Sequence, residues 1–214
     1  MDAVLLSSFV KLKKGGVLLD LGTGNGILPI LLSAKTEGKH FTGIEIQERA
    51  YDMALRSVRI NALEDRIDIV KGDIKEAADI FSAASFDCVI SNPPYMTGGQ
   101  GILNPESAKA ISRHEILLTF SDVVFAASRL LKNGGSFFLV HRPLRLPEIF
   151  GEMREQGIEP KRMRMVYPDI LHEPSMVLIE GRKGGNPALK CEKPLVISNP
   201  DGSYTEETER TYGF

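Results

Sequence analysis

The chain has 214 residues, of which 43% are hydrophobic and 25% charged, and a formal net charge of −2. This length suits one ordinary domain with a buried core, and the charge argues against a protein that coats nucleic acid without specificity. No apolar run is long enough to span a bilayer, and the first residues lack the features of a secretory signal peptide.

Strand and helix signals alternate along the chain. Short apolar runs predict strands at residues 17–21, 41–46, 67–72, 86–91, 136–142 and 174–182. Apolar residues at helical spacing predict helices at 25–36, 47–62, 114–132 and 144–156, the third of which ends at Asn133-Gly134-Gly135. This alternation predicts βα units, so we expect an α/β fold with a mostly parallel, Rossmann-like sheet covered by helices on both faces.

The chain divides into a domain and a tail. We expect residues 1–185 to form the domain, and residues 186–214, which are polar and rich in turn residues, to form an extension packed on or near it. The extension is either a hairpin about 199–202 or a loosely docked segment. The loop 96–113 is long and rich in Gly and Ser, and such loops in compact domains are usually functional.

Two cysteines, Cys88 and Cys191, lie far apart in sequence and form no metal-ligand spacing. Cys88 lies within an apolar strand, so we expect a buried, reduced thiol. A reduced thiol indicates a cytoplasmic location, and the spacing indicates no bound metal.

Two basic clusters lie in the second half of the chain, KRMR at 161–164 and GRKGG at 181–185. Solvated surface charge is the simpler interpretation of each. They gain significance only if another feature indicates a polyanionic partner.

A glycine-rich turn, DLGTGNG at 20–26, follows the first strand and precedes a helix. Glycines let the backbone approach a ligand, and the helix N-terminus offers free N–H groups. Alone, this pattern indicates a nucleotide-like cofactor or a tight turn without a ligand. The third glycine comes one residue earlier than in the dinucleotide fingerprint, and Asp20 suits an ammonium group better than a pyrophosphate.

Acidic residues end the next two strands. Glu45 lies about 20 residues beyond the glycines, where a carboxylate can bind both hydroxyls of a ribose. Asp73 is placed to accept a hydrogen bond from an adenine amino group. For each residue alone, a solvated strand end is the simpler interpretation. Together with Asp20 and the glycine turn, they favour S-adenosylmethionine over NAD.

The stretch FDCVISNPPYMTGG, residues 86–99, runs from an apolar strand directly into two prolines. Proline fixes φ and removes a hydrogen-bond donor, so two in a row end any strand. The stretch is either a simple stop with a rigid turn or a rigid shelf that presents Asn92 and Tyr95 to a ligand.

DLGTGNG, FTGIEI, GDI at 72–74 and SNPPY at 91–95 together resemble the class I S-adenosylmethionine-dependent methyltransferases. That resemblance implies a Rossmann-like, seven-stranded sheet. NPPY is similar to the signature of the branch that methylates planar amino groups of adenine, cytosine, guanine or a glutamine side chain.

Over nearly its whole length the chain is most similar to the bacterial tRNA1(Val) adenine-37 N6-methyltransferases. The similarity rests on MDAVLLSSFV, SRHEI at 112–116, FFLVHRPLRLPEI at 137–149 and LVISNPDGSYTEE. Members of this family normally have a short segment before MDAVLL, so we expect the chain to lack one.

The resemblance implies roles for individual residues. Asn92 and Pro93 would accept the two N–H bonds of the target amine, and Tyr95 would stack on the base, a contact worth roughly 1–3 kcal/mol. Arg113, His114 and Arg142 are candidate substrate or RNA contacts, although each also suits an ordinary helix start or a solvated position. Cofactor binding is implied for Asp20, Gly22, Thr23, Gly24, Glu45, Ile46, Asp73, Ile74 and Asn92.

The implied reaction is direct transfer of a methyl group from S-adenosylmethionine to N6 of an adenine in tRNA, with no metal or covalent intermediate. One alternative is N5-glutamine methylation of a protein such as a release factor, although no N-terminal helical substrate domain is visible. An adenine DNA methyltransferase would need a target-recognition region, which the sequence lacks. A third alternative is a non-catalytic cofactor-binding module, which the presence of Asn92 and Tyr95 disfavours.

Overall fold

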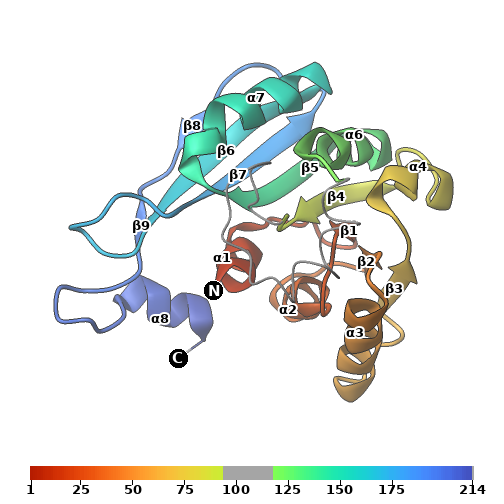
Figure 1. The fold of residues 1–214 in the computed structure, drawn as a ribbon, viewed down its shortest axis with the longest axis horizontal. Coiled ribbons are helices and arrows are strands. Elements are labelled where there is room, and N and C mark those ends of the chain that lie inside the picture. The colour runs from red at the N-terminus through yellow and green to blue at the C-terminus, as the bar shows by residue number, and fades with distance from the viewer. Residues whose placement is uncertain (94–117, 214) are drawn as a thin grey trace, which may run out of the picture.

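The computed structural model describes residues 1–93 and 118–213 (Figure 1). Its strands are β1 (Val17–Leu21), β2 (His40–Glu45), β3 (Ile67–Lys71), β4 (Phe86–Ser91), β5 (Leu131–His141), β6 (Ile158–Tyr167), β7 (Met176–Lys183), β8 (Lys190–Cys191) and β9 (Leu195–Val196). Its helices are α1 (Asp2–Phe9), α2 (Ile27–Lys35), α3 (Glu48–Ile60), α4 (Ala77–Ile80), α6 (Phe120–Leu130), α7 (Leu146–Glu155) and α8 (Glu206–Tyr212), with 3-10 turns η1 (Ile74–Glu76) and η2 (Pro143–Arg145).

The strands form one sheet in the order β3-β2-β1-β4-β5-β7-β6-β8, and β9 also pairs with β6. Strands β1 to β5 pair in parallel, whereas β7 is antiparallel to both β5 and β6. The α/β class and the mostly parallel sheet are therefore confirmed. The short strands β8 and β9 add to the seven strands expected.

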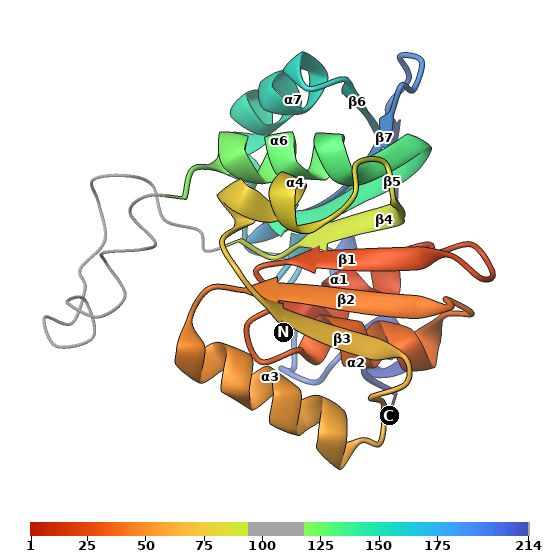
Figure 2. The same ribbon diagram turned by 90° about the vertical axis from the view of Figure 1, so that its right-hand side faces the viewer.

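Helices cover both faces of the sheet, as Figures 1 and 2 show. Buried residues of α4, α6 and α7 pack against one face, and buried residues of α1, α2 and α3 pack against the other. This two-sided burial explains why β1 and β4 are nearly continuous apolar runs rather than alternating ones. None of the helices in the described residues is long and apolar enough to cross a membrane.

Three predicted boundaries around α6 and β5 are wrong. The helix expected over 114–132 begins at Phe120, because Thr119 and Asp122 form a capping box at its start. It ends at Leu130, since Leu131 turns to extended backbone and pairs with Phe86. The Asn133–Gly135 stretch therefore lies inside β5, which starts before the expected residue 136.

Strand β6 is the largest element that the sequence did not predict, and it contains the basic cluster KRMR. Arg162 is only 9% exposed, so this residue does not carry solvated surface charge. Its guanidinium donates to Glu180 at 2.6 Å, to Glu192 at 3.2 Å and to the Phe9 carbonyl at 2.7 Å. It also lies 3.8 Å from the centre of the Phe9 ring. Arg162 thus joins β6 to β7, to the residue after β8 and to the end of α1.

The residues after 185 make several contacts with the sheet and with α1. β8 and β9 pair with β6, and Arg164 bonds Glu207 of α8 at 2.7 Å. A tight turn at 199–203 is closed by hydrogen bonds between Asn199 and Ser203. Neither cysteine forms a disulfide, and Cys88 is buried as expected.

Replacing Arg162 by Ala should lower the free energy of unfolding by about 3–5 kcal/mol, because Glu180 would keep a buried charge without its partner. Chemical denaturation measures the change. Arg154→Ala is the matched control. Arg154 also forms an ion pair, with Glu159, but its side chain is 60% exposed. The control should change stability by less than about 1 kcal/mol. Equal losses in the two variants would contradict the structural role of Arg162.

Candidate functional site

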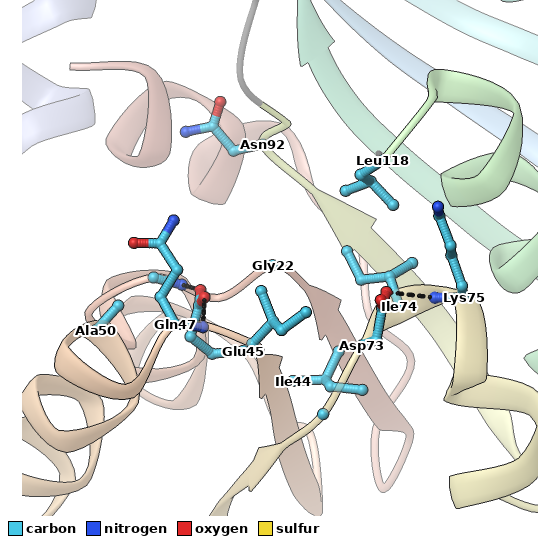
Figure 3. A pocket seen from close by; sticks show the side chains of 13 residues that line it. Gly22, Ile44, Glu45, Gln47, Ala50, Asp73, Ile74, Lys75, Asn92 and Leu118 are labelled. Carbon is cyan, nitrogen blue, oxygen red and sulfur yellow. Dashed lines mark hydrogen bonds between the residues drawn. The ribbon is translucent and has the colours of Figure 1, made fainter. Parts of the chain in front are cut away.

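A cavity of about 380 Å³ lies where the carboxyl ends of β1, β2, β3 and β4 meet (Figure 3). In open α/β sheets ligands bind at this edge, because the loops that follow parallel strands converge there. Seven residues singled out from the sequence line the cavity: Gly22, Gly24, Glu45, Ile46, Asp73, Ile74 and Asn92.

The glycine turn is anchored to β2 by its own backbone. The N–H groups of Gly22 and Thr23 both donate to the carbonyl of Ile44 at 3.0 Å. Gly22 and Gly24 have φ of 77° and 59°, a left-handed conformation that favours glycine. The turn is therefore held open toward the cavity without a side chain from either glycine.

Glu45 connects the loops after β1 and β2. One carboxylate oxygen accepts from Gly24 N–H at 2.9 Å and the other from Gln47 N–H at 2.8 Å. Because a carboxylate offers about four acceptor positions, these two bonds leave capacity for a ligand's hydroxyl groups. Glu45 is only 7% exposed, so its position is fixed by burial as well as by hydrogen bonds.

Thr23 packs directly on β2 at Gly43. A Cβ at Gly43 would lie 2.7 Å from the Thr23 hydroxyl and methyl, closer than side chains tolerate. Gly43 is therefore required for the turn to lie against the strand. No local pattern in the sequence marks this requirement, because Gly43 lies in the middle of a strand.

Asp20 is fully buried at the end of β1 and does not line the cavity. Neither of its carboxylate oxygens, nor the Thr23 hydroxyl, has a hydrogen-bond partner among the described residues. Burial raises the pKa of Asp20 to about 7, the Thr23 hydroxyl opposes this shift and the nearby Glu45 charge adds to it. A buried carboxyl without donors is costly, and a cationic group in the neighbouring cavity would favour its charged form.

The third acidic residue begins the segment after β3. Asp73 accepts a hydrogen bond from the Lys75 N–H at 2.9 Å and starts η1. Figure 3 shows Ile44 and Ile74 beside it. Ile46 is 36% exposed although it is apolar. Apolar side chains with a carboxylate at the margin suit a planar ring that carries an amino group.

Asn92 follows β4 and lines the cavity on the side opposite Glu45 (Figure 3). The end of β4 is fixed to β1, because the Ser91 hydroxyl donates to the Leu21 carbonyl at 2.9 Å. Pro93 lines a second, smaller recess together with Phe120 and His141. Leu118 lines both hollows, so the recess adjoins the cavity at Asn92–Pro93.

His141 is a buried group of this recess that the sequence did not single out. Its ring lies edge-on to Phe120 with the centres 5.8 Å apart, and its Nδ1 accepts the Arg142 backbone N–H at 2.8 Å. Burial lowers the pKa of His141 to about 4, and Arg145 and Arg142 add to the shift against Glu148. The imidazole is therefore neutral at physiological pH.

The other predicted residues are placed as follows. Thr23 is buried beneath the turn, and Arg142 is exposed at the start of η2. Tyr95, Arg113 and His114 lie outside the described residues. Within the described residues, no three His, Cys, Asp or Glu side chains are close enough to hold a metal ion.

Six cavity residues were missed from the sequence: Ile44, Gln47, Ala50, Gly72, Lys75 and Leu118. Five of them lie within five residues of Glu45 or Asp73, so widening the search around each acidic strand end would have found them. Leu118 reaches the cavity only through the tertiary path of the chain, and no local signal marks it.

Comparison with known proteins agrees with this arrangement. The chain is 31% identical to the tRNA1(Val) (adenine(37)-N6)-methyltransferase of Tolumonas auensis, over 96% of this chain and 84% of the relative. It is 26% identical to the enzyme of the same name from Aeromonas hydrophila, with the same two coverages.

Solved structures share the fold. A predicted O-methyltransferase from Agrobacterium tumefaciens has a TM-score of 0.80 at 22% identity, covering 100% of this chain and 96% of that one. A geranyl diphosphate C-methyltransferase from Streptomyces coelicolor, solved with S-adenosyl-L-homocysteine, has a TM-score of 0.64 at 14% identity, covering 85% and 79%. The family model for the methyltransferase small domain matches residues 2–156. The resemblance inferred from the sequence is thus confirmed, and the chain belongs to the methyltransferase small domain family.

Proposed function

We propose that the protein transfers a methyl group from S-adenosylmethionine to the exocyclic N6 amine of an adenine in tRNA, with adenine 37 of tRNA(Val) as the target. One observation carries the proposal. Asn92 and Pro93 leave β4 at the wall of a cavity whose other walls are the glycine turn, Glu45 and Asp73. The names of the two relatives support tRNA as the substrate.

The cavity fits the methyl donor. The unpartnered carboxyl of Asp20 lies two residues before Gly22, the first glycine of the turn, and would stabilise the donor's ammonium group. Glu45 would bind the ribose hydroxyls, and Asp73 with Ile46 and Ile74 would hold the adenine. When bound, S-adenosylmethionine supplies a methyl group on a positively charged sulfur.

The contribution of the protein is mainly the position of two hydrogen-bond acceptors. The amine of adenine is a poor nucleophile because its lone pair is delocalised into the ring. The Asn92 side-chain oxygen and the Pro93 carbonyl would accept its two N–H bonds and favour a pyramidal nitrogen with its lone pair aimed at the methyl group. Proline holds these acceptors in place, which is preorganisation for the transition state.

The neighbouring recess combines an aromatic pair with one cation. The ring of His141, neutral above about pH 4, lies edge-on to Phe120, and Arg145 lines the same recess. The proton that the amine loses can leave after methyl transfer, so the reaction requires no strong general base. We also propose that Tyr95 stacks on the target base.

The reaction is tested with radiolabelled S-adenosylmethionine and bulk tRNA that lacks the modification, followed by nucleoside analysis. We expect labelled N6-methyladenosine from the unaltered protein. Asn92→Ala should lower kcat by about 10²–10³-fold, as loss of a preorganised polar group at a reacting centre does. Binding of S-adenosylhomocysteine by the variant is the control and should persist.

Other outcomes of this experiment would overturn the proposal. Label in a release factor and none in tRNA would assign the protein to glutamine methylation. Binding of the donor with no label in tRNA or protein would indicate a non-catalytic module. Full activity of the Asn92→Ala variant would exclude Asn92 as an acceptor that activates the target amine.

The pKa of Asp20 predicts a trade-off between stability and binding. Because the pKa is raised from 3.8 to about 7, the folded protein retains a proton that the unfolded chain loses, and stability falls as pH rises between these values. Asp20→Asn should therefore be about 2–4 kcal/mol more stable than the unaltered protein at pH 8 and nearly equal to it at pH 4.

The same variant should bind S-adenosylhomocysteine roughly tenfold more weakly, because about 1.4 kcal/mol of attraction to the ammonium group is removed. Denaturation at the two pH values and titration calorimetry measure the two effects. A variant with unchanged stability at pH 8, or with unchanged affinity, would contradict the role assigned to Asp20.

A further inference from the structure

A second hollow lies at the opposite edge of the sheet, at the amino ends of the strands. Its volume is about 190 Å³, and its lining includes Lys11, Lys13, Lys132, Arg182 and Asp87. In Figure 2 the amino ends of β1 and β4 lie at the right, away from the carboxyl ends that border the methyl-transfer cavity. The two hollows are therefore separate sites.

The hollow carries an excess of positive charge. Lys13 and Lys132 share one carboxylate, with their ammonium groups 2.8 Å and 3.0 Å from Asp87. Burial alone would raise the pKa of Asp87, but hydrogen bonds from Lys13, Val17 and Lys132 outweigh it and lower the pKa to about 2. Asp87 is thus a permanent anion that already has three donors.

The other two cations of the hollow, Lys11 and Arg182, differ from this pair. Neither of them forms an ion pair with any described residue. Four cationic side chains therefore surround a single carboxylate, in a protein whose formal net charge is −2. Such a local reversal of sign favours an anionic ligand.

The start of β5 lines the hollow with Asn133, Gly134, Gly135 and Ser136. Gly134 has φ of 76°, a conformation that favours glycine. A Cβ at Gly135 would lie 2.9 Å from the Lys132 carbonyl oxygen and 3.1 Å from the Asp87 carbonyl oxygen. Gly135 thus lets the start of β5 approach the Asp87 carbonyl on β4 closely, which fixes the Lys132 side of the hollow beside Asp87.

We propose that this hollow binds a backbone phosphate of the RNA substrate, at a distance from the methylated base. Asp87 and Asn92 lie five residues apart on and just after β4, which corresponds to about 17 Å at roughly 3.3 Å per residue. About five stacked nucleotides, at roughly 3.4 Å each, cover that distance. The assignment of the phosphate to RNA rests on the proposed function, whereas phosphate binding itself does not.

The first test compares two double variants that remove the same charge. The first double variant carries Lys11→Ala and Arg182→Ala. It should raise KM for tRNA about tenfold and leave kcat and the KM for S-adenosylmethionine unchanged. It should also reduce the slope of log Kd against log salt by about 0.7–0.9 for each phosphate that the variant no longer binds. Lys14→Ala with Arg210→Ala, both exposed and outside the hollow, should change KM less than about twofold. Equal effects in the two double variants would overturn the proposal.

The second test does not depend on methyl transfer. Amide resonances of Gly134 and Gly135 are followed in the labelled full chain during titration with inorganic phosphate and, separately, with tRNA. The expected result is saturable shifts with both ligands that disappear in Lys11→Ala with Arg182→Ala. Shifts with phosphate alone would overturn the assignment to RNA, and an absence of shifts with either ligand would overturn the site itself.

Discussion

The site depends on the two hydrogen bonds that Glu45 accepts from Gly24 and Gln47. They fix the loop after β1 to the loop after β2, and the Ile44 carbonyl adds two further bonds to the same turn. Without these four hydrogen bonds the glycine turn would have no fixed position relative to Glu45 and Asp73. Asn92 is held on the other side of the cavity because Ser91 bonds the end of β4 to Leu21 of β1. The parallel sheet thus sets the position of Asn92 relative to Glu45 and the glycine turn.

Three of the four buried side-chain oxygens without a hydrogen-bond partner in the described residues lie at the glycine turn. The buried side-chain oxygens without partners in the described residues belong to Asp20, Thr23 and Ser85, and the first two lie at the glycine turn. Buried polar groups are normally hydrogen-bonded, so exceptions call for a physical reason. The cationic ligand group that we propose near Asp20 would supply one, at the expense of stability in its absence. Arg162 shows the contrasting case, a buried charge whose three guanidinium nitrogens each donate to an acceptor.

Local patterns predict the parts of this protein that local chemistry determines. The glycine turn, Glu45 and Asp73 follow apolar strands, and the parallel sheet brings such strand ends together without any long-range information in the sequence. Strand β6 was not predicted because its charged residues resemble those of a surface segment. Arg162 can be buried because its acceptors lie on β7 and at the end of α1, far from it in the sequence. Leu118 and His141 were missed because their place beside Pro93 arises from the pairing of β4 with β5 and from the start of α6.

The most direct measurement is a crystal structure of the full chain with S-adenosylhomocysteine. We expect the ribose hydroxyls to lie within hydrogen-bond distance of Glu45, the amino group to lie on the Asp20 side of the glycine turn and the sulfur to point toward Asn92. A ligand bound outside this cavity, or bound in it with the sulfur turned away from Asn92, would contradict the proposed methyl-transfer site.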